Sequence, residues 1–149
     1  MSNKISLSVI AGVIATAVMT LVMFIAPMMG MPKMNPPAML SMVMGFPLIV
    51  GWMMHFMIGI IFALSYAFLF NNILHKIKSN VVRGIVFGFI AFVWAQISMK
   101  LMGLVFMMPP MHGSLALIIM GSIIGHLVFG IIVVVVLSRA VETATVKTA

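Results

Sequence analysis

Four long hydrophobic stretches, separated by short polar or proline-containing segments, form the dominant pattern of this chain. They cover residues 5–26, 46–70, 81–99 and 115–138, and none alternates apolar with polar residues at every second position. A helix needs about 20 apolar residues to cross the hydrocarbon of a bilayer. Because lipid offers no partners to backbone groups, continuous runs of this length predict helices. We therefore expect an all-α membrane protein with four transmembrane helices.

The same sequence pattern occurs twice along the chain. Motifs of the first half recur 71 to 73 positions later, pairing Met29-Gly30 with Met102-Gly103, Pro36-Pro37 with Pro109-Pro110, His55 with His126, and Gly59 with Gly130. Internal similarity of this kind indicates a tandem duplication, here of a two-helix unit. Repeat 1 is expected at about 5–70 and repeat 2 at about 81–138, within a single domain covering 1–149. Residues 141–149 are expected to form a polar tail.

The composition supports a membrane protein, and the charge predicts its orientation. The chain is 64% hydrophobic and 6% charged, whereas soluble domains carry about 25% charged residues. Six of the eight lysines and arginines fall at the N-terminus, in the central polar loop or near the C-terminus, and only Lys33 and Lys100 fall between the paired stretches. Cytoplasmic segments carry the excess of positive residues. The formal charge of +7 is therefore interpreted as topology, with both termini cytoplasmic, and not as affinity for nucleic acid.

The residue inventory excludes most catalytic chemistry. The sequence contains no cysteine, and its one acidic residue, Glu142, lies in the polar tail. Thiolate metal sites and cysteine nucleophiles are thereby excluded, as are carboxylate proton relays within the membrane. We expect a protein that is not an enzyme.

Two histidines lie within hydrophobic stretches, each on a stripe of small residues spaced by four. Gly51 and Gly59 flank His55, Ser122 and Gly130 flank His126, and Gly84 and Gly88 form a matching stripe on the third stretch. Residues four apart share one helix face, and faces of small residues are where membrane helices approach closely. Both histidines are therefore expected to face protein.

The histidine pair has two interpretations. Two imidazoles from facing helices, flanked by glycines that leave room for a flat macrocycle, would suit axial ligation of haem. The pair would equally suit another transition metal. Alternatively, each imidazole makes only an interhelical hydrogen bond, for which Thr16, Thr20, Gln96 and Ser98 are available; such bonds contribute about 0.6 kcal/mol in membranes.

Methionines supply a second candidate site. Of 19 methionines, 12 lie in the segments 28–44 and 99–111 that join the paired stretches. Thioethers favour Cu(I), so Met107, Met108 and Met111 beside His112 form a candidate copper site. The alternative is that these flexible side chains fill gaps in the packing.

The strings MFIAPMMGMPKMNPP, GWMMHFMIGIIFALSYAF and GSIIGHLVFG give the chain a family resemblance. It resembles an uncharacterised family of small four-helix bacterial integral membrane proteins with Gly-x-x-x-His-x-x-x-Gly helices, a domain of unknown function. Gly51, His55 and Gly59 match that motif, whereas the second half has Ser122 in place of the first glycine. The resemblance implies the fold and a bacterial cytoplasmic membrane, and no activity.

Three functional hypotheses fit these residues. The first is a non-catalytic binding or accessory bundle with a haem or metal site at His55 and His126. The second is a copper-handling protein that uses the methionine-rich segments. The third is a structural subunit of a larger membrane complex. The lipid bilayer is the expected surrounding in each, with a homodimer or a larger assembly as the expected partners.

Overall fold

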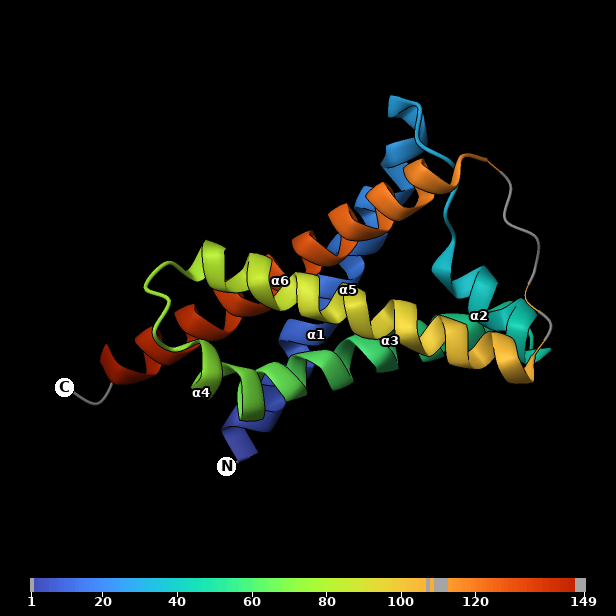
Figure 1. Cartoon of the computed structure of the whole chain (residues 1–149). Coiled ribbons are helices and arrows are strands. Elements are labelled where there is room, and N and C mark those ends of the chain that lie inside the picture. The colour runs from blue at the N-terminus through green and yellow to red at the C-terminus, as the bar shows by residue number, and fades with distance from the viewer. Residues whose placement is uncertain (1, 107, 109–112, 147–149) are drawn as a thin grey trace.

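The structure, a computed structural model, describes residues 2–106, 108 and 113–146, with the backbone alone for residues 2 and 140–146. All of its regular elements are helices (Figure 1). In chain order these are α1 (Ser2–Ile25), the 3-10 turn η1 (Ala26–Met29), α2 (Pro36–Met44), α3 (Leu48–Ser65), the π-helical segment η2 (Tyr66–Phe70), α4 (Asn71–Leu74), α5 (Asn80–Val105) and α6 (Leu115–Val146).

Four continuous helical segments are long and apolar enough to cross a membrane. They are Asn3–Met29, Leu48–Leu74, Asn80–Val105 and Leu115–Arg139, each of 25 to 27 residues. At 1.5 Å per residue, about 20 residues suffice for the hydrocarbon layer. The expected all-α class with four membrane-crossing helices is therefore confirmed at the level of helix length and composition.

The four long helices pack in the order α5, α6, α1, α3. Helix α6 packs against both α5 and α1, and α1 packs against both α6 and α3. The backbones of α3 and α5 make no comparable contact. Along this remaining edge the two helices are separated by their side chains. Phe62 of α3 meets Phe129 of α6 with ring centroids 6.4 Å apart. Side chains of α3 and α6 therefore meet across the centre of the bundle.

Glycines permit the close approach of the helices at matching places in the two halves. A Cβ atom added at Gly12 would lie 2.7 Å from Ile60 Cα, and one added at Gly84 would lie 2.5 Å from Ile131 Cα. Real Cβ atoms do not come so close to backbone, so any larger residue would push the helices apart. The two contacts lie 72 and 71 positions apart in the sequence, like the repeated motifs.

The first proline-rich segment contains a helix that the sequence analysis did not include. Pro36 and Pro37 occupy the first two positions of α2, where a missing N–H costs nothing. The Asn35 side chain caps the helix by accepting a bond of 3.1 Å from the Ala38 N–H. Helix α2 packs on α3 at Gly51, where an added Cβ would lie 2.9 Å from Ser41 Cβ. A proline pair that cannot continue a helix here begins one.

Helix α6 extends beyond the last apolar stretch. It continues through the first residues of the expected polar tail to Val146.

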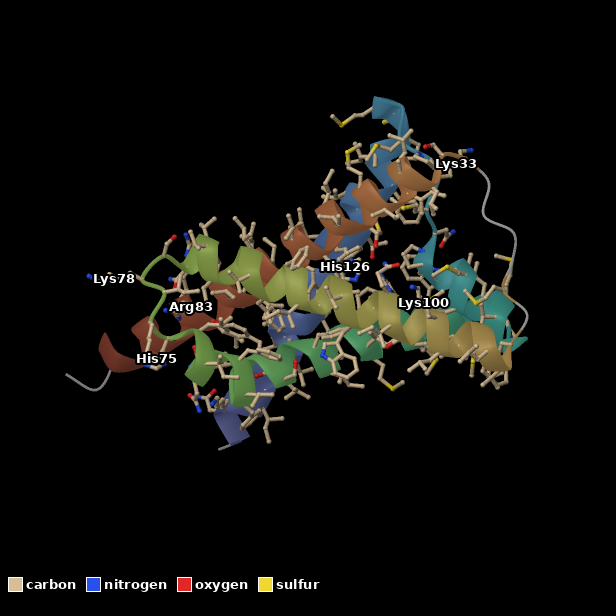
Figure 2. All side chains as sticks on the ribbon, viewed as in Figure 1. Lys33, His75, Lys78, Arg83, Lys100 and His126 are labelled. Carbon is tan, nitrogen blue, oxygen red and sulfur yellow. The ribbon has the colours of Figure 1, made fainter. Side chains whose placement is uncertain are left out.

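The charged residues lie at two ends of the bundle. His75, Lys78 and Arg83 lie together at one end, and Lys33 and Lys100 lie toward the other (Figure 2). Lys4 belongs to the first group, since its Nζ lies 4.6 Å from the ring centre of Phe68 in η2. We call the end with the segment 75–79 the loop end and the opposite one the methionine end.

Candidate functional site

The threonines of α1 begin a buried polar layer. Thr16 donates its hydroxyl proton to the Gly12 carbonyl at 2.7 Å, and Thr20 donates its own to the Thr16 carbonyl at 2.7 Å. Both hydroxyls bond back to the preceding turn of their own helix, the usual arrangement when no water is near. The oxygen of each hydroxyl remains able to accept a hydrogen bond from another helix.

His55 of α3 uses this acceptor. Its Nε2 lies 3.0 Å from Thr20 Oγ1, and the side chain is buried. With the single hydroxyl proton of Thr20 assigned to the Thr16 carbonyl, the proton in the contact with His55 comes from Nε2. A neutral His55 therefore carries its proton on Nε2 and keeps a lone pair on Nδ1.

His126 of α6 has the opposite tautomer. Its Nδ1 lies 2.7 Å from the carbonyl oxygen of Ser122, one turn earlier. A carbonyl only accepts, so Nδ1 carries the proton and Nε2 keeps the lone pair. Within the described part of the chain, Nε2 has no hydrogen-bond partner. The ring is T-shaped to that of Phe92 of α5, with centroids 5.9 Å apart and an interplanar angle of 72°.

The two imidazoles belong to one polar layer in the bundle. Both lie beside the same part of α1, since His55 contacts Thr20 and Gly125, next to His126, packs against Met19 and Met23. Figure 2 places His126 in the central part of the molecule. Gln96 of α5 donates a long hydrogen bond of 3.4 Å to the Ser122 hydroxyl. We call Thr20, His55, Gln96, Ser122 and His126 the histidine layer.

Neighbouring helices fill the space beside the glycines that flank the histidines. A Cβ at Gly59 would overlap the side chain of Thr16, and one at Gly130 would lie 2.6 Å from Gly88 Cα. Gly88 in turn packs against the backbone at His126, where an added Cβ would lie 2.8 Å from Leu127 Cα. These positions therefore leave no gap for a flat macrocycle.

The candidate copper site of the second repeat falls mostly outside the described residues. Met107, Met111 and His112 are not described, and Met108 is partly exposed at 38%. Among the described residues, no group of three or more histidines and carboxylates lies close enough to hold a metal ion.

A different group of methionines packs beside the histidine layer. An added Cβ at Gly125, the neighbour of His126, would lie 3.1 Å from Met23 Cε and 3.5 Å from Met19 Cε. Both methionines come from α1 and are buried. The sequence analysis missed this contact, although Gly121 and Gly125 form a second stripe of small residues on α6 that could have indicated it.

Comparison with known proteins gives a family and no activity. A family model described as a family of unknown function (DUF6789) matches residues 2–148. No curated protein and no solved structure matches the chain.

Proposed function

The chain belongs to this family of unknown function, and we propose that it is a non-catalytic membrane protein whose histidine layer holds a transition-metal ion. The only acidic residue of the sequence, Glu142, follows the last membrane-crossing segment. A metal held within the membrane therefore depends on neutral ligands. Neutral imidazole is the most common such ligand in proteins.

The observation that carries the proposal is the hydrogen bond between His126 and Ser122. Histidines that bind metals almost always donate their second ring N–H to a carbonyl, a carboxylate or water, which fixes the tautomer and orients the ring. The bond of 2.7 Å from Nδ1 to the Ser122 carbonyl does both. It leaves Nε2 of His126 as an oriented lone pair within an apolar bundle.

The remaining ligands would come from His55 and from methionines beside the layer. His55 offers Nδ1, because its Nε2 donates to Thr20. Met19 and Met23 of α1 carry thioethers and pack against Gly125, the neighbour of His126 in the sequence. Imidazole together with thioether favours copper, and Cu(I) above all. Haem is less well supported, since the spaces beside Gly59 and Gly130 are filled by Thr16 and Gly88.

The setting of this site is also part of the proposal. We place the protein in a bacterial cytoplasmic membrane, with both termini and the segment 75–79 in the cytoplasm, on the excess of positive residues at the loop end. The matching glycine contacts at Gly12 and Gly84 support a tandem duplication. The isolated bundle or a homodimer would suffice for binding.

The test is the metal content and the absorption spectrum of the protein purified from cells grown with copper. The wild type should retain copper, His126→Leu should lose it, and His55→Leu should weaken its retention. His75→Leu is the matched control, since His75 lies at the loop end, where its Nδ1 bonds to the carbonyl of Asn72. Equal copper in the His126→Leu and wild-type proteins would contradict the proposal. A Soret band lost in both variants would select haem, and a metal-free protein that always purifies with another chain would select the structural role.

A further inference from the structure

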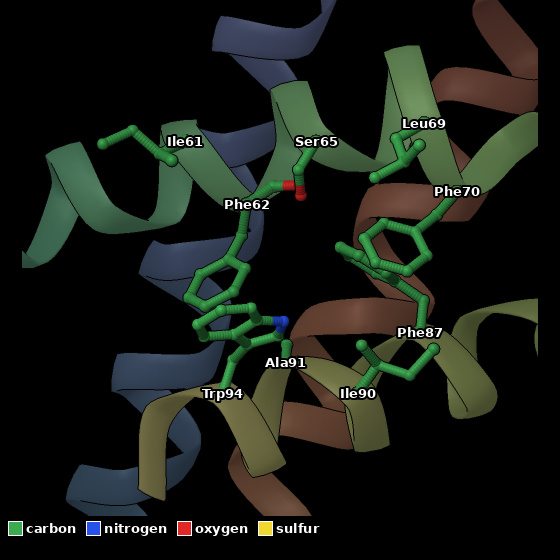
Figure 3. Close-up of a pocket in the computed structure, with 9 residues that line it drawn as sticks. All are labelled: Ile61, Phe62, Ser65, Leu69, Phe70, Phe87, Ile90, Ala91 and Trp94. Atoms are coloured by element: carbon green, nitrogen blue, oxygen red, sulfur yellow. The ribbon is translucent and has the colours of Figure 1, made fainter. Parts of the chain in front are cut away.

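The open edge between α3 and α5 contains an apolar cleft. It encloses about 360 Å³ and is shown in Figure 3. Its lining comes from both helices and from η2, and consists of Ile61, Phe62, Ser65, Leu69, Phe70, Phe87, Ile90, Ala91 and Trp94. Ser65 donates its hydroxyl to the Phe62 carbonyl of its own helix at 2.7 Å. The cleft therefore suits a hydrocarbon chain better than a polar ligand.

The cleft has the length of part of an acyl chain. Phe70 and Phe87 line it nearest the loop end, with ring centroids 5.5 Å apart. It follows α3 and η2 for roughly 14 Å, from Ile61 to Phe70, at 1.5 Å per residue. The apolar side chains along this length suit a single extended hydrocarbon chain.

The cleft begins within the leaflet on the loop side and reaches the middle of the bilayer. Along α5, Phe87 lies about 10 Å and Trp94 about 21 Å from Asn80, at 1.5 Å per residue. One leaflet of a bilayer contributes roughly 15 Å of hydrocarbon. The cleft thus lies at the depth of the methyl end of an acyl chain that enters from the loop side.

Positive charge lies where the head group of such a lipid would be. The segment 75–79 joins the α3 side of the cleft to α5 and carries Lys76 and Lys78, both exposed. The only acidic residue of the chain is Glu142, so no carboxylate in this segment neutralises the lysines. Basic groups next to a membrane helix attract anionic head groups.

From this arrangement we infer a binding site for one anionic phospholipid. Its acyl chain lies in the cleft between Phe70 and Trp94, and its phosphate is held by Lys76 and Lys78. The π-helical segment at Tyr66–Phe70, a feature frequent at functional sites, brings Leu69 and Phe70 into the lining. This site is separate from the histidine layer and does not depend on the metal.

Trp94 provides a direct probe of the cleft. The Trp52→Phe protein retains Trp94 as its single tryptophan and is reconstituted in phosphatidylcholine vesicles. A fixed small fraction of the lipid is either phosphatidylglycerol or phosphatidylcholine with bromine near the methyl end of the acyl chain. Brominated phosphatidylglycerol should quench Trp94 more strongly than brominated phosphatidylcholine. Trp94→Phe, which retains only Trp52 against Phe24 and Phe56, should show no such preference.

Charge variants identify the head-group contact. Lys76→Gln with Lys78→Gln should lower the preference for phosphatidylglycerol by about thirtyfold, given the usual contribution of each lysine near an anionic surface. Lys33→Gln with Lys100→Gln removes the same charge at the methionine end and should leave the preference intact. Equal quenching by the two lipids, or a preference unaffected by the Lys76 and Lys78 changes, would overturn the inference. Absence of quenching by either lipid would also overturn it, and would indicate that protein covers the cleft.

Discussion

At the scale of single residues, the hydrogen bonds of the histidine layer determine which ring nitrogen of each histidine carries the proton. Thr20 donates to its own helix, which forces His55 to donate from Nε2. Ser122 accepts through its carbonyl, which forces His126 to donate from Nδ1. Two histidines with similar sequence surroundings therefore present different ring nitrogens. In the proposed metal site, this difference would make His126 the main ligand and His55 a second ligand.

Replacing Thr20 by valine should destabilise the bundle modestly. Valine keeps the shape of threonine but removes the acceptor for His55 Nε2, which is then buried without a partner. The expected loss is about 0.6 kcal/mol, the average for interhelical hydrogen bonds in membranes. It can be measured as the free energy of unfolding in mixed detergent micelles. Thr20→Ser, which keeps the hydroxyl, is the control, and equal stability of the two variants would mean that the bond contributes nothing.

At the scale of helices, contacts between backbones hold the bundle together. Gly84, Gly88 and Gly130 allow α5 and α6 to touch along their length. In lipid, apolar side chains gain little by leaving their surroundings, so such close contact carries much of the association. The stability of the helix contacts therefore depends more on the position of each glycine than on the hydrophobicity of the residues around it.

A single added methyl group at the contact between α5 and α6 should destabilise the fold. Gly130→Ala places a Cβ within 2.6 Å of Gly88 Cα, and overpacking of this kind costs about 1–3 kcal/mol. Gly103→Ala is the control, because among the described residues its Cβ would meet the flexible side chain of Met108, at 3.2 Å. Thermal melting in detergent should separate the two variants clearly. Equal melting temperatures would show that α5 and α6 do not depend on the close approach.

The helices could be predicted from the sequence because their signals are local. Long apolar runs and small residues four apart indicate the four spans and the faces of Gly59 and Gly130. Asn35 before Pro36 is also a local helix-start signal, and it was overlooked in favour of the helix-breaking effect of proline. The contacts beyond one helix were harder to predict. Thr20 was one of several candidate partners for His55, and the self-contact of His126 with Ser122 could not be chosen from spacing alone.

At the scale of the whole molecule, the bundle is asymmetric in charge and in packing. Positive residues collect at the loop end, and three of the four edges between long helices are closed by backbone contact. The open edge between α3 and α5 could not be predicted from the sequence, because the repeat favours two similar interfaces between its halves. The chain therefore combines a closed side with the histidine layer and an open side with an apolar cleft.

The orientation in the membrane can be tested directly. Reporter fusions at Lys78 should indicate the cytoplasm, and fusions at Lys33 should indicate the opposite side, because positive residues are retained on the cytoplasmic face. Changing Lys76, Lys78 and Arg83 together to glutamine should weaken this preference. Reporters with the opposite pattern would place the methionine end in the cytoplasm and would reverse the leaflet assigned to the lipid.

The histidine layer itself can be tested by nitrogen-15 NMR of the imidazole rings in the membrane-reconstituted protein. We expect His126 to carry its proton on Nδ1 and His55 to carry its proton on Nε2. Added Cu(I) should shift the resonance of His126 Nε2 most strongly and leave its Nδ1 proton in place. A metal-free His126 protonated on Nε2, or rings of both histidines that do not respond to Cu(I), would contradict a metal site in this layer.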